Sequence, residues 1–263
     1  MTRSIRSYLE LAQTLTVREI IVRYKRSAFG VVWALADPAL HVVVYLLTFG
    51  AILDAGRGVA SYPLFTLLGV LPWLFFSTTL DHSAGVLIEH ALLIRKLSFP
   101  TELLVISVAI SRLTTLLIGV LLTLAVAVVL GLAGSAHPAW ERAPFVLVGL
   151  VLLTMFAIGL SLVAAAVGVV FGDAQFLVRF ALRIGFFACP IVYPITRVPD
   201  LARPLYELNP LVGMLWCFQG VSDASLQAPS MTSWLAAVAG AVGGVAAGWL
   251  VFSRLRGVVA ELV

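Results

Sequence analysis

The sequence has little charge and almost no cysteine. Only 11% of its 263 residues are charged, whereas 61% are hydrophobic, and the mean hydropathy is +1.07. Soluble domains carry about 25% charged residues, so this composition excludes that class and indicates an integral membrane protein. Cys189 and Cys217 lack CxxC or Cys/His spacing. No metal site is therefore predicted, and a disulfide between them stays open.

The motifs of common enzymes are also missing. The sequence contains no GxxxxGK[ST] loop, no HExxH and no GxSxG. We therefore expect neither nucleotide binding nor an activated nucleophile in this chain, and no cofactor. The net charge of +4 is explained by membrane topology, and no basic cluster alternates with solvent-facing aromatics, so no nucleic-acid partner is predicted.

Long apolar runs dominate what remains. Four stretches lack any Asp, Glu, Lys or Arg, at 58–80, 113–140, 143–172 and 224–253. Each exceeds the roughly 20 residues that cross a bilayer as a helix. The stretches 28–53 and 174–195 are similar but carry polar interruptions. The sequence thus predicts one all-α membrane domain over 1–263, with six spans at 28–53, 62–88, 100–133, 143–171, 174–195 and 231–252.

The basic residues predict the orientation of these spans. Twelve of the 17 Lys and Arg fall on one side of the predicted topology, four fall on the other, and Arg112 lies inside the third span. Because cytoplasmic loops carry the excess of Lys and Arg, both termini are expected in the cytoplasm. The first 27 residues do not read as a secretory signal, since the apolar run starts late and no small-residue cleavage site follows it.

The first predicted span carries polar and aromatic residues at steps of four. A four-residue step turns only about 40° around a helix, so these residues form one slowly winding ribbon. Asp37 could line a polar route. It could also cap a helix break before Pro38, or pair with Arg112. The ribbon consists of Phe29, Trp33, Asp37, His41, Tyr45 and Phe49.

Other spans carry recognisable patterns. Arg179 and Arg183, one turn apart, could hold a phosphate or pyrophosphate, or could be interfacial anchors. Asp81 and His82 are expected to form a hydrated pair at the membrane surface. Small residues at steps of four predict close helix packing in two spans. They are Gly240, Gly244 and Gly248 in the last span, and Ala164, Gly168 and Gly172 in the fourth.

Four segments resemble the membrane subunit of bacterial type-2 ABC exporters, which move O-antigen, capsular, teichoic-acid or related cell-wall polysaccharides. They occur in the family's order and, taken together, are far more specific than one apolar motif. The last stretch, "FSRLRGVVAELV", fits the family loosely. The matching segments are "LTVREIIVRYKRSAFGVVWALADPAL" at 15–40, "LLGVLPWLFFSTTL" at 67–80, "LIRKLSFPTELL" at 93–104 and "PIVYPITRVPDLARPLYELNP" at 190–210.

This resemblance implies a six-span subunit of the bacterial inner membrane that forms a homodimer. Two copies of a separate cytoplasmic ATPase would bind ATP and Mg²⁺. Residues 89–99 would be the cytoplasmic coupling helix that docks into the ATPase, although they also fit an ordinary charged turn. The docking residues would be Glu89, Leu92, Leu93, Arg95, Lys96 and Leu97.

The same resemblance makes 5–26 an amphipathic helix on the inner leaflet. Apolar residues recur there at helical spacing, and the basic residues Arg23, Lys25 and Arg26 follow; these could contact anionic lipid or the pyrophosphate of a lipid-linked glycan. Residues 196–221 would form an outward gate of short re-entrant helices before the last span. Its candidate residues are Tyr193, Pro194, Asn209 and Pro210.

The implied function is ATP-driven export of a lipid-linked polysaccharide through a channel at the dimer interface. Aromatic faces suit such a path because they stack on sugar rings with little sequence specificity, but they could equally be packed in the protein. Export of a drug or lipid, or a membrane enzyme acting on polyprenyl phosphates, are the alternatives. The channel candidates are Phe29, Trp33, Asp37, His41, Tyr45, Trp73, Phe75 and Phe76.

Overall fold

The fold is helical throughout the part of the chain that the structure describes. The computed structural model describes residues 5–24, 33–96 and 99–262, and no strand occurs in these ranges. Its α-helices are α1 (Ile5–Tyr24), α2 (Trp33–Tyr45), α3 (Tyr62–Glu89), α4 (Ala91–Lys96), α5 (Glu102–Leu132), α6 (Ala143–Val170), α7 (Ala174–Phe187), α8 (Arg203–Glu207), α9 (Pro210–Gln219) and α10 (Met231–Leu262). A π-helix, η2 (Leu46–Ile52), and the 3₁₀ turns η3 (Trp140–Arg142), η4 (Ile195–Arg197) and η5 (Gly220–Ser222) complete it.

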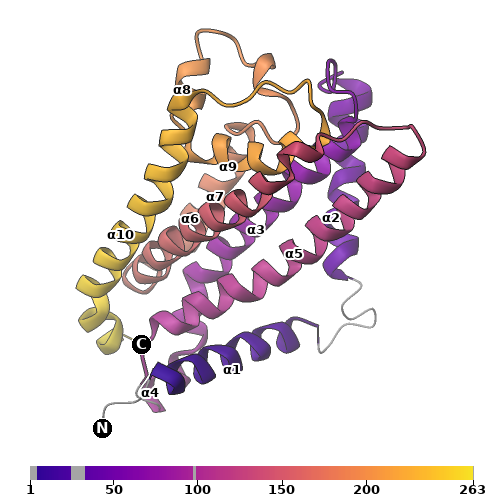
Figure 1. Ribbon diagram of the computed structural model, residues 1–263. Helices are drawn as coiled ribbons and strands as arrows, with labels where there is room; N and C mark the ends of the chain where they lie inside the picture. Colours follow the sequence, from indigo (N-terminus) through magenta and orange to yellow (C-terminus); the bar gives the residue numbers. More distant parts are fainter. Residues whose placement is uncertain (1–4, 25–32, 97–98, 263) are drawn as a thin grey trace.

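The long helices form a bundle with two distinct ends (Figure 1). Helix α1 lies beneath α5 at one end, where α4 and the C-terminal part of α10 also lie. Helices α8 and α9 lie toward the opposite end. We refer to these as the α4 end and the α8 end. The first helix and the last therefore meet at one end of the bundle.

Four helices in the described ranges are long and apolar enough to cross a membrane. They are Tyr62–Glu89, Glu102–Leu132, Trp140–Val170 and Met231–Val258. Each contains most of one of the four charge-free runs of the sequence. Helices satisfy their backbone hydrogen bonds internally, which the hydrocarbon core requires. The chain is therefore a multi-pass membrane protein.

The fifth predicted span differs most from the observed helix. It was expected at 174–195, but α7 ends at Phe187. Pro190 and Pro194 lack the N–H that a continuing helix needs, and the Cys189 carbonyl accepts from Ile191 N (2.9 Å) in a tight turn instead. Fourteen helical residues rise about 21 Å, less than the roughly 30 Å of a hydrocarbon core.

Helix α10 continues ten residues beyond the predicted end at 252. Its last turns have partners in the bundle: Phe252 is fully buried, and Arg256 forms an ion pair with Glu102 at the start of α5. The residues after 252, outside the predicted span, are therefore part of the helix.

A helix break at Pro38 was one sequence-based alternative, and it is wrong. The backbone is α-helical from Trp33 to Tyr45, straight through position 38. The irregular segment comes one turn later, as the π-helix η2. There the Tyr62 ring lies so close to Gly50 that a Cβ would meet it at 2.8 Å. The side chain of Asp37 lies outside the described part, so its role stays a prediction.

Helix α3 lies at the centre of the packing. It contacts α5, α6, α7 and α9, and most of its side chains are buried. Helix α9 is itself almost wholly buried where it packs between α3, α6 and α10. In lipid, such packing stabilises a bundle through van der Waals contact, because the apolar surface is not being removed from water.

Small residues let α6 and α10 approach to backbone contact. A Cβ on Gly248 of α10 would overlap the carbonyl of Gly159 on α6, and a Cβ on Gly159 would overlap the backbone of Gly244. A Cβ on Gly240 would meet the Pro210 ring at 2.5 Å. The predicted glycine row of the last span is therefore a packing surface.

The corresponding prediction for the fourth span is only partly correct. Gly168 meets the backbone of Ala84 on α3. Gly172 lies beyond the end of α6 with open space around it. The glycine that meets α10 is Gly159, outside the predicted row.

Gly248→Ala is expected to lower the stability of the bundle by about 1–3 kcal/mol, the usual cost of overpacking. Gly243→Ala is the matched control on the same helix, because a Cβ there meets nothing within 4 Å. It should be neutral or slightly stabilising, since alanine favours helix over glycine. The midpoint of thermal unfolding in detergent separates the two, and equal midpoints would contradict close packing at Gly248.

Candidate functional site

The predicted coupling helix is short, and its residues face two ways. Helix α4 spans only Ala91–Lys96. Leu92 is 73% exposed, and Glu89, Arg95 and Lys96 are exposed beside it. Leu93 instead packs back against the apolar cluster of the bundle. The expected leucine anchor is thus divided, with Leu92 outward and Leu93 inward, while Leu97 lies outside the described residues.

Helix α4 is tied to the end of α3 by His90. The His90 carbonyl accepts from Leu93 N (2.9 Å) and Ile94 N (3.0 Å), which caps the first turn of α4. The ring Nδ1 contacts the Val86 carbonyl at 2.9 Å. A carbonyl can only accept, so Nδ1 carries the proton in this contact.

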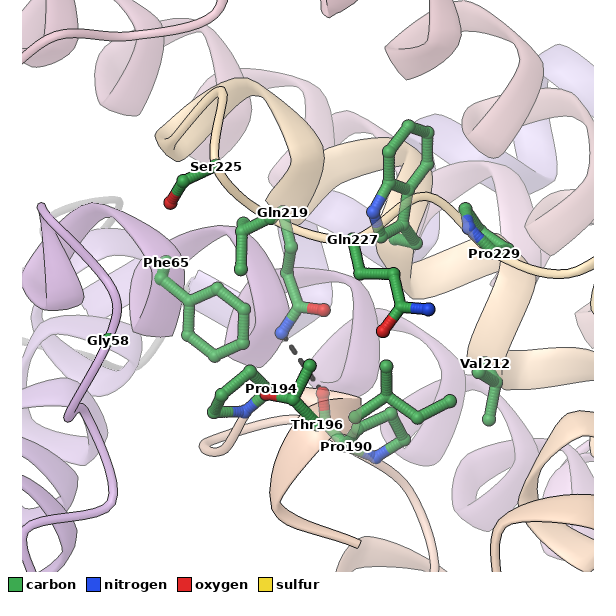
Figure 2. Close-up of a pocket in the computed structure, with 13 residues that line it drawn as sticks. Gly58, Phe65, Pro190, Pro194, Thr196, Val212, Gln219, Ser225, Gln227 and Pro229 are labelled. Carbon is green, nitrogen blue, oxygen red and sulfur yellow. Dashed lines mark hydrogen bonds between the residues drawn. The ribbon is translucent and has the colours of Figure 1, made fainter. Parts of the chain in front are cut away.

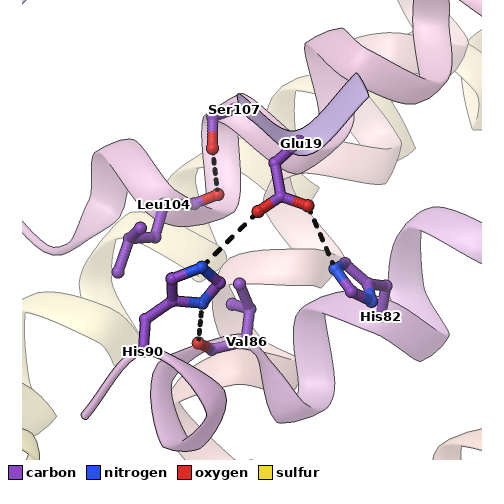
Figure 3. A network of polar contacts seen from close by, with 6 residues as sticks. All are labelled: Glu19, His82, Val86, His90, Leu104 and Ser107. Atoms are coloured by element: carbon purple, nitrogen blue, oxygen red, sulfur yellow. Dashed lines mark hydrogen bonds and ion pairs between the residues drawn. The ribbon is translucent and has the colours of Figure 1, made fainter. Parts of the chain in front are cut away.

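The end of α1 meets the same histidine (Figure 3). The Glu19 carboxylate lies between two histidines, with Oε2 at 3.4 Å from Nε2 of His82 on α3 and Oε1 at 3.6 Å from Nε2 of His90, which follows α3. These contacts are ion pairs whenever the imidazoles are protonated. Leu15, one turn earlier, is buried in the apolar cluster that α1 shares with α3 and α5. The placement of 5–26 on the inner leaflet stays a prediction.

The expected hydrated pair of Asp81 and His82 is wrong, because each has a protein partner. His82 faces Glu19, and Asp81 Oδ1 accepts from Arg179 Nε at 2.7 Å. Arg179 and Asp81 are both partly exposed, so their pair contributes roughly 0.2–1 kcal/mol. Arg183 is exposed one turn further along α7.

The basic group at the end of α1 stays a prediction. Lys25 and Arg26 lie outside the described residues, as does the side chain of Arg23. Of the five predicted phosphate-binding residues, the structure therefore places only the two arginines of α7.

Three channel candidates lie in the interior of the single subunit. Trp73, Phe75 and Phe76 are 4–6% exposed. The Trp73 ring contacts Phe76 (5.8 Å between centroids), and Phe76 stacks on Phe156 at 5.6 Å. These contacts bind α3 to α6.

The other half of the predicted ribbon is half-buried on α2. His41 and Tyr45 have ring centroids 6.0 Å apart, and Tyr45 lies 6.1 Å from Phe49. Tyr45 also contacts Phe186 of α7 at 5.1 Å. The rings at steps of four therefore follow one another in contact from His41 to Phe49, and Tyr45 among them contacts α7. Phe29 and the side chain of Trp33 lie outside the described part.

The predicted gate residues gather at the α8 end. The Tyr193 hydroxyl donates to the Phe187 carbonyl (2.7 Å) and contacts the Tyr206 hydroxyl at 3.0 Å. The Asn209 side chain accepts from Leu211 N (3.1 Å) and so caps α9, which Pro210 begins. Pro194 is buried nearby. These contacts fasten the irregular segment after α7 to α8 and α9.

Cys189 and Cys217 are both free and buried. The Asn209 amide donates to Cys189 Sγ at 3.2 Å. The disulfide left open by the sequence is therefore not formed in this structure.

A cavity of about 120 Å³ lies beside the gate residues (Figure 2). Gln219 reaches across it and donates to the carbonyls of Pro190 (3.1 Å) and Ile191 (2.9 Å). Phe65 and Gln227 also line it, and none of the lining residues in the described part of the chain is charged. No sequence pattern marked Gln219, because its role depends on carbonyls that proline leaves without helical partners.

Asp223 and Arg142 hold the same end together. Asp223 accepts from Ala60 N (2.7 Å) and from Ser225 N (2.8 Å). Arg142 donates to the carbonyls of residues 223, 224 and 226 and lies over the Trp216 ring. Three connections are therefore joined: the loop before α3, the start of α6 and the segment before α10.

The electrostatics of Asp223 follow from these contacts. Burial alone would raise its pKa, but the Ala60 and Ser225 hydrogen bonds and the charge of Arg142 outweigh burial and lower the pKa. Asp-Ala-Ser ahead of Pro229 is a turn signal that could have marked Asp223. Arg142 had no signal beyond its charge.

Among the described residues, no group of three or more His, Cys, Asp or Glu is arranged to hold a metal. The fold and its two polar ends define the class as a multi-pass helical membrane protein, with its polar contacts gathered where helices end.

Comparison with known proteins gives the family. Residues 10–222 match the family described as ABC-2 type transporter. The chain belongs to this family.

Individual relatives agree over most of the chain. It is 33% identical to the O-antigen export system permease protein RfbA of Myxococcus xanthus over 223 residues, 84% of this chain and 83% of the relative. A protein of the same name from Klebsiella pneumoniae is 26% identical, covering 78% and 77%. The polysialic acid transport protein KpsM of Escherichia coli is 25% identical and covers 76% of each chain.

The low pKa of Asp223 predicts a pH dependence of stability. A carboxylate whose folded pKa is lowered stabilises the fold above its ordinary range, and this contribution is lost as pH falls below that range. Near neutral pH, Asp223→Asn should lower the free energy of unfolding by about 1–3 kcal/mol. The variant should therefore unfold at a lower temperature than the wild type. Its midpoint should approach that of the wild type at pH 3. A constant difference between the two proteins across this pH range would contradict the assignment.

Proposed function

We propose that this chain is the permease subunit of an ATP-driven exporter that moves a cell-surface polysaccharide, carried on a lipid, out of the cytoplasm. The observation that carries the proposal is the agreement over most of the chain with relatives named for O-antigen export and polysialic acid transport. Their names share one substrate class, the cell-surface polysaccharide.

The proposed topology has six crossings of the bacterial inner membrane. The four long helices supply four, α2 with η2 a fifth, and α7 with the segment that follows it the sixth. An even number of crossings puts the first and last helices on one side. The excess of Lys and Arg on that side supports a cytoplasmic location for both termini.

The proposed assembly is a homodimer with two copies of a cytoplasmic ATPase, which bind ATP and Mg²⁺. Helix α4 is the proposed contact with the ATPase. Its exposed Leu92, beside Arg95 and Lys96, offers an apolar anchor with charges that orient the partner.

The proposed channel lies between the two subunits. Support comes from the seam where Tyr45 of α2 meets Phe186 of α7. Next to it, the exposed side chains of Phe180 and Phe187 alternate with Arg183. This surface offers aromatic faces for sugars and a cation for a phosphate group. Trp73, Phe75 and Phe76 lie behind it and would support the wall rather than touch the glycan.

Deleting the gene should abolish the surface polysaccharide while its synthesis continues in the cytoplasm, and the intact chain should restore it. The surface and cytoplasmic pools of glycan are measured separately by extraction and gel analysis. Surface polysaccharide at normal levels without the chain would overturn the proposal. Loss of both pools would indicate a role in synthesis instead.

Leu92→Asp should weaken association with the ATPase by at least about tenfold, because truncating a buried apolar anchor typically costs over 1 kcal/mol. Leu201→Asp is the control, since Leu201 is 96% exposed at the α8 end. Co-purification of the tagged permease with the ATPase encoded beside it measures the effect. If Leu92→Asp recovered as much ATPase as Leu201→Asp, α4 would not be the contact.

A further inference from the structure

Three elements meet at His90. Its carbonyl caps α4, its Nδ1 contacts the Val86 carbonyl near the end of α3, and its Nε2 faces Glu19 of α1. The side chain of His90 is only 12% exposed. A displacement of α4 must therefore pass through a buried group that also touches α1.

Glu19 holds this junction from the side of α1. Its side chain is 14% exposed and reaches both His82 of α3 and His90, the residue that follows the end of α3 (Figure 3). A carboxylate that contacts two rings fixes the position of α1 along α3 as well as its distance from it.

The apolar contacts of α1 fix its other degrees of freedom. Leu11, Leu15 and Glu19 follow at steps of four and so share one face of α1. Leu11 and Leu15 pack into a cluster with Leu87 of α3 and Leu104 of α5. These contacts hold α1 against α3 and α5, and Glu19 adds the polar contact at the end of the same face.

We propose that Glu19 is a positioning residue that joins α1 to α4, so that movement of α4 driven by the ATPase also moves α1. This inference rests on the proposed function, because only an ATPase partner would displace α4. The amphipathic helix then acts as a lever at the membrane surface rather than as a passive anchor. Its movement would reach the start of α2, which follows it in the chain.

The first test measures the junction itself, without the ATPase or the glycan. Spin labels on Gln13→Cys and Leu92→Cys report the distance between α1 and α4, because both positions are exposed. The buried Cys189 and Cys217 are replaced by alanine. A narrow distance distribution is expected, and Glu19→Gln should broaden it. Glu10→Gln, a carboxylate lost from an exposed position of α1, should leave it narrow. An unchanged distribution in Glu19→Gln would overturn the proposal.

The second test measures transport. Glu19→Gln should bind the ATPase and hydrolyse ATP as the wild type does, but export about fivefold less glycan per ATP, the lower end of coupling between linked sites. Glu10→Gln should keep the wild-type ratio. A wild-type ratio in Glu19→Gln would contradict the lever. Absence of export by the wild-type chain would instead overturn the proposed function, and the distance measurement would still decide the role of Glu19.

Discussion

The constraint on which the rest of the structure depends is that hydrocarbon offers backbone N–H and C=O groups no hydrogen-bond partner. The chain meets it with long helices, and the described segments between helices at the α8 end find donors and acceptors in neighbouring elements. The turn after α7 is the clearest case, since Gln219 satisfies the carbonyls of Pro190 and Ile191 from α9. Within the bundle, contact is left to small and apolar residues such as Gly159 and Gly248.

The two ends of the bundle meet this constraint with different chemistry. At the α8 end, Arg142 and Asp223 bind mainly backbone groups, which fixes loops to one another. At the α4 end, side chains of separate helices pair directly, as in Glu19 with His90 and Arg256 with Glu102. Contacts to backbone groups fix the conformation of the loops, whereas side-chain pairs join separate helices that can move together.

Sequence reasoning found what depends on composition and spacing. The four long helices, the short helices before the last span and the glycine row of α10 were all predictable, because apolar runs and repeats are local properties. Side-chain partners were not. Asp81 was expected to form a hydrated pair with His82, but it pairs with Arg179 of α7. A break at Pro38 was one alternative, but the helix continues through it. Leu92 and Leu93, adjacent in sequence, face opposite ways because helix orientation decides which is buried.

Export itself is the central claim, and vesicles containing the purified permease and its ATPase test it most directly. With ATP added on the side of the ATPase, lipid-linked glycan should pass to the opposite side and become accessible to a glycan-degrading enzyme there. Vesicles without ATP or without the permease should protect the glycan. Sustained ATP hydrolysis without any transfer, or transfer that needs no ATP, would contradict the account.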